Sequence, residues 1–178
     1  MILREGAPYR DMDVRDVIKH RFSVRNYQDK EIPPDVLLDI LETARLSPSA
    51  KNRQEWQFIV VTDKAKKEQL SDVANGQKFV AQAAAVIAGV ATEPGYVMTC
   101  GIPASHIDVA IAMEHIALAA VAYGLGTCWI GSFYQDRALR VLSLPEEWAV
   151  IALMPIGYPA LQAPEKRRKP LEDIVRFI

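Results

Sequence analysis

Two arginines that flank a serine near the start of the chain form its clearest pattern with chemical potential. Residues 21–27 read Arg-Phe-Ser-Val-Arg-Asn-Tyr. Side chains alternate between the two faces of an extended chain, so Arg21, Ser23 and Arg25 are predicted to point one way and Phe22 the other. Guanidinium groups grip phosphate oxygens in a bidentate manner, and a hydroxyl can complete the shell. These residues predict a phosphate site, with a surface loop of solvated arginines as an equal alternative.

Three further segments carry patterns of the same kind. Residues 47–56 read Ser-Pro-Ser-Ala-Lys-Asn-Arg-Gln-Glu-Trp and run into an apolar stretch. Residues 124–133 read Gly-Leu-Gly-Thr-Cys-Trp-Ile-Gly-Ser-Phe, and residues 166–171 read Lys-Arg-Arg-Lys-Pro-Leu. Alternation within the last segment puts Lys166 and Arg168 on one side. Its simpler interpretation is a solvated charge patch.

These four segments, in this order, resemble the FMN-dependent nitroreductase family. Its members begin with an Arg-x-Ser-x-Arg/Lys phosphate motif and carry a Ser-Pro-Ser-x-x-Asn-x-Gln-Pro-Trp segment before a strand. The match runs from residue 21 to residue 171 and so covers nearly the whole chain. Two departures are Glu55 in place of the usual proline and the absence of the extra helical segments of the better-known members.

The resemblance implies that FMN binds without a covalent link at the interface of a homodimer. Arg21, Ser23 and Arg25 would hold its phosphate, and Lys166 and Arg168 would return to the same phosphate from the end of the chain. One phosphate dianion that faces several cations is a strong and salt-sensitive anchor.

The other motifs are implied to contact the rest of the cofactor. Pro48 and Ser49 would approach from the partner chain, Asn52 and Gln77 would hydrogen-bond the ring edge or ribityl chain, and residues 131–132 would pack on or near the isoalloxazine. No protein acid or base and no metal ligand is predicted, because the cofactor performs the redox chemistry. The implied cofactor-binding residues are Arg21, Phe22, Ser23, Arg25, Pro48, Ser49, Asn52, Gln77, Gly131, Ser132, Lys166 and Arg168.

The implied activity is that of an NAD(P)H-dependent flavin oxidoreductase. It would reduce nitroaromatic or quinone-type acceptors by two electrons in a ping-pong cycle. Two alternatives stay open: an FMN-binding or sensing protein with little acceptor turnover, and a same-fold enzyme with another reaction such as dehalogenation, dehydrogenation or flavin fragmentation. The physiological acceptor and the choice between NADH and NADPH are not predicted.

The irregular loop 94–104 is expected to line the open face of the flavin. Tyr96, Met98 and Ile102 would form an apolar wall suited to flat, electron-poor acceptors. A surface linker remote from the site is the alternative.

Other patterns predict no further site. The third glycine of a dinucleotide fingerprint that begins at Gly124 would fall at Trp129, and a strand is expected to follow. The three histidines lack metal-binding spacing. Cys128 lies in an apolar stretch and is expected to be a core thiol, while Cys100 has no basic neighbour that would activate it.

Composition limits the class of protein. A chain of 178 residues fits a single domain, here residues 1–178, and its 21 basic and 22 acidic residues give no field that would gather nucleic acid. The two distant cysteines argue for free thiols in a reducing compartment, so we expect a cytoplasmic protein. Charges within residues 4–11 leave no apolar core for a signal peptide. Asp108 and Glu114 in the apolar segment 105–123 favour a soluble core helix over a membrane span.

Periodicity predicts a mixed α/β (α+β) domain. Apolar, β-branched runs predict strands at 56–61, 85–91, 127–130 and 148–156. Helices are expected after Asp11 or Asp13, over about 36–44, after Asp63, over 105–123 and over 137–144. By resemblance the fold is a three-layer sandwich, a central and mostly antiparallel sheet flanked by helices. Its homodimer would form through the long apolar helix and the C-terminal arm, because the apolar end of the chain needs a surface to pack on.

Overall fold

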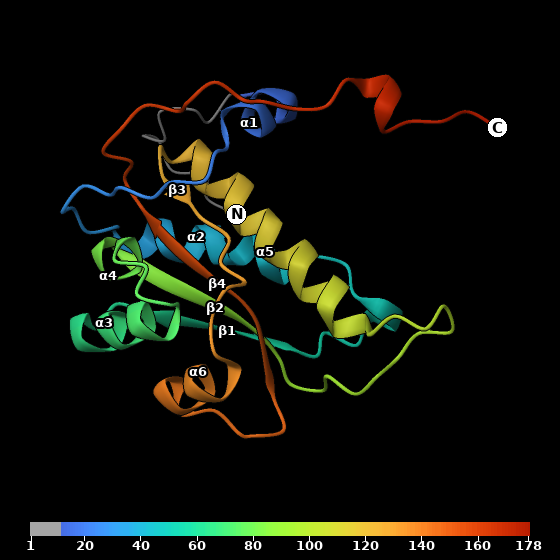
Figure 1. The fold of residues 1–178 in the computed structure, drawn as a ribbon, viewed down its shortest axis with the longest axis horizontal. Helices are drawn as coiled ribbons and strands as arrows, with labels where there is room; N and C mark the ends of the chain where they lie inside the picture. Colours follow the sequence, from blue (N-terminus) through green and yellow to red (C-terminus); the bar gives the residue numbers. More distant parts are fainter. Residues whose placement is uncertain (1–11) are drawn as a thin grey trace.

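The computed structural model describes residues 12–178 and shows a four-stranded sheet between two layers of helices (Figure 1). The strand order is β1-β2-β4-β3, and neighbouring strands are antiparallel. Residues 1–11 lie outside the described residues. The prediction that they hold no signal peptide, and the possible helix cap at Asp11, both fall in this range. The strands are Trp56–Val61 (β1), Ala85–Ala91 (β2), Gly126–Thr127 (β3) and Ala149–Gly157 (β4).

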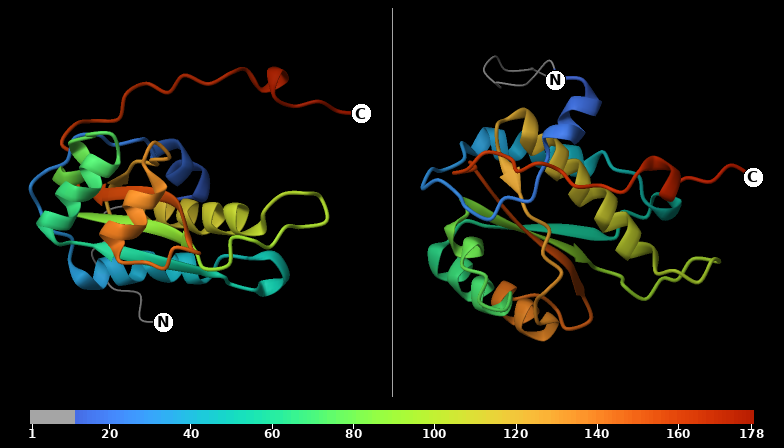
Figure 2. Two further views of the ribbon diagram at one scale, coloured as in Figure 1. Left: turned by 60° about the horizontal axis from the view of Figure 1, so that its bottom comes forward. Right: turned by 45° about the horizontal axis from the view of Figure 1, so that its top comes forward.

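The helices cover both faces of the sheet, which confirms the predicted three-layer sandwich (Figures 1 and 2). Helices α2 and α5 share one apolar core with the sheet, and helices α3 and α6 share another. Asp13 and Asp63 cap the first and third helices with their carboxylates, as predicted. The helices are Val14–His20 (α1), Pro34–Arg45 (α2), Lys64–Val73 (α3), Phe79–Gln82 (α4), Ala104–Ala122 (α5) and Gln135–Leu142 (α6), with 3-10 turns at Ala50–Asn52 (η1) and Leu171–Asp173 (η2).

Strand β2 lies inside the sheet and is buried at every position. A strand covered on both faces carries a continuous apolar run, and residues 85–91 are such a run. Gly89 in this strand allows helix α5 to approach closely, because a Cβ at that position would lie 2.8 Å from Val109 Cγ1 and 2.9 Å from Met113 Cγ. At this point the side chains of Val109 and Met113 on α5 therefore pack directly on the backbone of Gly89.

Strand β3 is shorter than the predicted segment 127–130. It pairs with β4 at two positions and leaves only an isolated bridge between Ile130 and Leu153. The next partner of β3 is Pro155, whose carbonyl accepts the N–H of Cys128 at 3.2 Å. Because proline has no N–H to return, the ladder is interrupted here, and pairing resumes only at the bridge between Ile130 and Leu153. The regular strand β3 therefore ends at Thr127, although Cys128 and Ile130 still hydrogen-bond to β4.

Helix α5 is long and apolar enough to cross a membrane by length and composition alone. In the fold, however, 56% of its most apolar window is buried, and the helix packs on β2, β4 and α2. Helix α5 is therefore a core helix of this fold.

The C-terminal segment leaves the body of the molecule after β4. It runs past α1 and then away from the helices and strands (Figures 1 and 2). From residue 160 to residue 178, Lys166 is the one residue that is not exposed. The apolar side chains of Leu171, Ile174, Phe177 and Ile178 are exposed. Within the described residues, no apolar surface of this one chain buries these side chains, so the docking of the tail on a partner subunit stays a prediction.

Candidate functional site

The arginine segment lies alongside strand β3. The N–H of Val24 donates to the carbonyl of Thr127 at 2.9 Å, and Ser23 forms a parallel bridge with Thr127. The side chain of Val24 is buried over Gly126, where a Cβ would lie 2.2 Å from Val24 Cγ2. A glycine at 126 is therefore needed for Arg21, Ser23 and Arg25 to reach this place.

Tyr27 fixes the far end of the same segment. Its buried hydroxyl lies 3.0 Å from the carbonyl oxygen of Val24 and 3.1 Å from that of Pro155, and it donates to them. Burial, and next the nearby Cys128 thiol, raise the pKa of Tyr27, so the hydroxyl keeps its proton and its role as donor. The segment is thus held by both backbone and side chain.

Three cations gather where this segment meets the C-terminal tail. Lys166 Nζ donates to the carbonyl oxygen of Ile18 at 2.9 Å, which places it beside α1 and Arg21. Burial lowers the pKa of Lys166, and the positive charges of Arg21 and Arg168 lower it further. Arg25 is close enough to Cys128 to oppose the rise in pKa that burial causes in this thiol. Arg21, Lys166 and Arg168 thus come together, and Arg21 and Arg25 both lie close enough to Cys128 to act on its thiol.

The cation cluster fits a phosphate group. Lys166 and Arg168 repel Arg21, and in the described part of the chain the cluster has one paired carboxylate, that of Glu114 at 4.0 Å from Arg21 Nε. Like charges that lie together with so little compensation favour an anion with several acceptor oxygens. Ser23 is an exposed residue of the same segment, and its side chain hydrogen-bonds the Cys128 thiol. Such a set of donors suits a phosphate group.

Gly131 and Ser132 lie at the other end of segment 127–132, and Gln77 lies two residues beyond their neighbour Asn75. Asn75 joins them, since its Nδ2 donates to Ser132 Oγ at 2.8 Å and to the Ser132 carbonyl at 3.2 Å. The side chain of Gln77 donates to the carbonyl of Ala74 at 2.9 Å. A Cβ at Gly131 would meet no atom within 4 Å, so the surface above it is open. A ligand that lay along residues 127–132 would reach from the cations to this group.

The segment from Ser47 to Gln54 is built around the first half of helix α5. The N–H of Ala50 donates to both carboxylate oxygens of Asp108, at 3.1 and 3.2 Å, and Ser47 Oγ lies 2.6 Å from His115 Nδ1. Non-glycine residues with left-handed backbone cluster here, at Lys51, Asn52 and Gln54. Such conformations persist only where the surroundings enforce them, and they concentrate at ligand sites.

Within one chain, the segment from Ser47 to Gln54 does not reach the cation cluster. Ala50 is tied to Asp108, whereas Arg21 lies beside Glu114, six residues or roughly 9 Å further along α5. No hydrogen bond or ion pair in the described residues joins Pro48, Ser49 or Asn52 to residues 21–25.

Loop 94–104 folds back on itself and contacts the 50–55 segment. Val97 bridges Pro103, and the N–H of Met98 donates to the carbonyl of Ile102 at 2.9 Å. The guanidinium of Arg53 lies 4.5 Å from the centre of the Tyr96 ring, and Lys51 Nζ lies 5.6 Å from it. The loop is therefore attached beside Asn52.

Sequence reasoning missed two residues of the site, Glu114 and Asn75. Glu114 was noted only as a charge that interrupts an apolar helix, yet its Oε2 accepts the indole N–H of Trp129 at 3.1 Å while Oε1 faces Arg21. Asn75 was not among the residues predicted to contact the cofactor. An acidic residue in an otherwise apolar helix was the available signal for Glu114.

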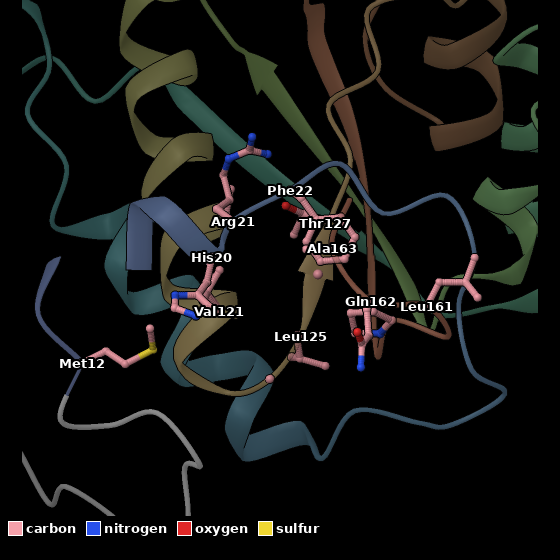
Figure 3. A pocket seen from close by; sticks show the side chains of 14 residues that line it. Met12, His20, Arg21, Phe22, Val121, Leu125, Thr127, Leu161, Gln162 and Ala163 are labelled. Atoms are coloured by element: carbon pink, nitrogen blue, oxygen red, sulfur yellow. The ribbon is translucent and has the colours of Figure 1, made fainter. Parts of the chain in front are cut away.

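A mostly apolar pocket of about 320 Å³ lies on the other side of Arg21, between α1, α5, β3 and residues 159–163. Figure 3 shows the guanidinium of Arg21 directed away from Leu125 and Gln162, which line this pocket. The Thr127 hydroxyl is buried at the same place and has no hydrogen-bond partner among the described residues. Phe22 lines this pocket as well.

Comparisons with known proteins agree with this geometry. The family model described as "Nitroreductase family" matches residues 18–99 and 77–158. A putative NADH dehydrogenase/NAD(P)H nitroreductase of Methanothermobacter thermautotrophicus is 34% identical over 84% of this chain and 78% of its own length. An FMN reductase [NAD(P)H] of Bacillus subtilis is 29% identical over 90% of this chain and 71% of its own length. The crystal structure of a nitroreductase family protein from Clostridium novyi NT superposes with a TM-score of 0.77 at 35% identity, over 83% of this chain and 86% of that one.

Proposed function

Because this chain belongs to the nitroreductase family, we propose that it is an NAD(P)H-dependent flavin oxidoreductase with FMN as its cofactor. FMN, when bound, supplies the two-electron chemistry that links NAD(P)H to an acceptor. The protein then contributes binding, orientation and exclusion of water, and no side chain is assigned as an acid or base.

The observation that carries this proposal is the cation cluster on the strand pair of Ser23 and Thr127. Arg21, Arg25, Lys166 and Arg168 would bind the phosphate with the Ser23 hydroxyl, and this arrangement needs an anion to balance it. Phe22, on the other face of the segment, anchors it in the pocket below.

The remaining predicted residues are proposed to contact the ring and the ribityl chain. Gln77, Gly131 and Ser132 would do so from the same chain, which supports a cofactor that lies along residues 127–132. Pro48, Ser49 and Asn52 would come from a partner chain, because they lie apart from the cations in a single chain.

We propose a homodimer with the flavin at its interface. Support comes from the separation of the two halves of the site and from the apolar side chains that lie exposed on one chain. Val14 and Ile18 on α1 are 62% and 52% exposed, and Phe177 in the tail is 95% exposed. Large apolar side chains that are left this exposed support burial against a second chain. A single flavin-binding domain over residues 1–178 and a cytoplasmic location, which suits the two free thiols, are part of the same proposal.

The proposed acceptors are nitroaromatics and quinones, reduced in a ping-pong cycle. The contact of Tyr96 with Lys51 and Arg53 supports a place for loop 94–104 beside the ring-binding residues. Flat, electron-poor molecules need few polar contacts and would pack against this loop.

The proposal is tested by loading purified protein with FMN and mixing it with NADH or NADPH in a stopped-flow instrument. The yellow absorbance should bleach rapidly and return when a quinone is added, and initial rates should give parallel double-reciprocal lines. A protein that binds FMN but is not reduced by either nucleotide would be a flavin-binding protein without this activity. A protein that binds no FMN would refute the proposal as a whole.

A further inference from the structure

Glu114 is an acidic residue placed inside a site made of cations. It lies on helix α5, and each of its carboxylate oxygens faces a different partner. Oε2 accepts from Trp129 Nε1 at 3.1 Å, and Oε1 lies 4.0 Å from Arg21 Nε. The side chain of Arg21 is 19% exposed and that of Glu114 is 43% exposed. The pair therefore lies at the edge of the solvent and not deep in the core.

Glu114 contacts both segments of the parallel bridge between Ser23 and Thr127, on opposite sides of the bridged residues. Arg21 precedes Ser23 by two residues, Trp129 follows Thr127 by two, and Ser23 and Thr127 are bridged. One carboxylate on α5 thus spans the two segments that carry the phosphate-binding residues. The other acid of α5 is Asp108, and it already accepts the N–H of Ala50.

The contact between Glu114 and Arg21 is an ion pair without a hydrogen bond. At 4.0 Å the ion pair is too long for a hydrogen bond, so the N–H groups of the guanidinium are not committed to Glu114. The carboxylate nevertheless compensates a largely buried guanidinium when no other anion is present. A phosphate dianion that reaches Arg21 must then approach a negative charge that is already there.

We propose that Glu114 is the internal counter-ion of Arg21, with which the phosphate of FMN competes, and that it limits how strongly the chain discriminates FMN from flavins without a phosphate. This inference rests on the proposed function. It makes Glu114 a residue that determines specificity through Arg21. It also predicts a sign: removal of the charge of Glu114 tightens FMN binding.

The test is a titration of the full-length chain, freed of flavin, with FMN and with riboflavin, which lacks the phosphate. In Glu114→Gln the amide oxygen still accepts from Trp129, while the negative charge is lost. The Kd for FMN should fall about two- to fivefold, the range of one partly exposed charge interaction. The Kd for riboflavin should not change, and the salt dependence of FMN binding should become steeper.

Glu68→Gln is the matched control, because it changes the net charge equally from an exposed position on α3. It should leave both constants unchanged. Glu114→Ala, which also removes the acceptor for Trp129, should tighten FMN relative to riboflavin as well. Weaker or unchanged FMN binding by folded Glu114→Gln overturns the inference while leaving the flavin enzyme intact. If wild-type protein binds no FMN, the proposed function and this inference fail together.

Discussion

The ammonium group of Lys166 donates a hydrogen bond to the backbone carbonyl oxygen of Ile18, with 2.9 Å between the two atoms. This contact joins the otherwise exposed tail to the end of helix α1, at the place where Arg21 and Arg168 repel the same ammonium group. An anion that binds all three cations would remove that repulsion. Anion binding and attachment of the tail are therefore coupled, and each must strengthen the other.

Limited trypsinolysis tests this coupling, because residues 166–169 are all lysine or arginine. FMN should slow cleavage in this segment about tenfold, which corresponds to one charge-assisted hydrogen bond. Riboflavin should not slow it, since it lacks the phosphate. Equal protection by both flavins would show that the ring, and not the phosphate, holds the tail.

Replacement of Arg21 and Arg25 by alanine should strip the flavin. Each guanidinium is expected to contribute about 1.5–3 kcal/mol through charged hydrogen bonds, so affinity should fall by about 100-fold or more. The ratio of flavin absorbance to protein absorbance measures this, and thermal unfolding checks the fold. Arg140→Ala, which breaks an exposed ion pair with Asp136 on α6, is the control and should retain full flavin content. A yellow double variant would contradict the assignment of these arginines.

Alkaline pH should destabilise the protein in part through Cys128. Burial raises the pKa of this thiol in the folded state, although Arg25, Ser23 and Arg21 oppose the rise. Above the unfolded pKa of about 8.5 the unfolded chain loses a proton that the folded chain keeps, so the free energy of unfolding falls as pH rises. The slope is at most about 1.4 kcal/mol per pH unit for one group.

Urea unfolding at several pH values from 7 to about 9.5 measures this slope, and it should be flatter in Cys128→Ala. Cys100→Ala is the matched control, because that thiol is exposed. The slope should be unaffected by the control, and an equal slope in all three proteins would exclude Cys128 as the source.

Truncation of Tyr96 and Met98 to alanine should change the acceptor profile. The ratio of rates with a quinone and a nitroaromatic is expected to shift by about two- to tenfold, the range of an aromatic contact. The affinity for FMN should be nearly unchanged, since these side chains do not belong to the cation cluster. Val97→Ala, at an exposed position between them, is the control. If the ratio stays constant, the loop does not line the acceptor site.

Elements with strong local signals were predictable from the sequence. The β-branched runs 56–61 and 85–91 are strands with those bounds, and Asp13 and Asp63 cap their helices. The end of β3 was not predictable, because it depends on Pro155, a pairing partner distant in sequence. Helix α4 was also missed, since its single turn of Phe79–Gln82 has no periodicity to detect.

The site was predictable only through its motifs. Arg21 and Lys166 are brought together by the fold, and no local pattern connects them. The same is true of Asn75 with Ser132 and of Glu114 with Trp129, whose roles exist only as long-range hydrogen bonds. The residue types indicated that a phosphate could be bound. The packing of α5 on the strand pair determined which side chains lie close enough to take part.

The close approach of Val24 to Gly126 has a consequence for natural variation. A Cβ at 126 would lie 2.2 Å from a methyl group of Val24, so the two positions are not free to vary independently. Relatives with alanine or serine at the position of Gly126 should carry a smaller residue at the position of Val24, or should have lost the arginine motif that Val24 holds in place. An alignment that pairs valine with a larger residue at 126 and keeps both arginines would show that the backbone can yield there.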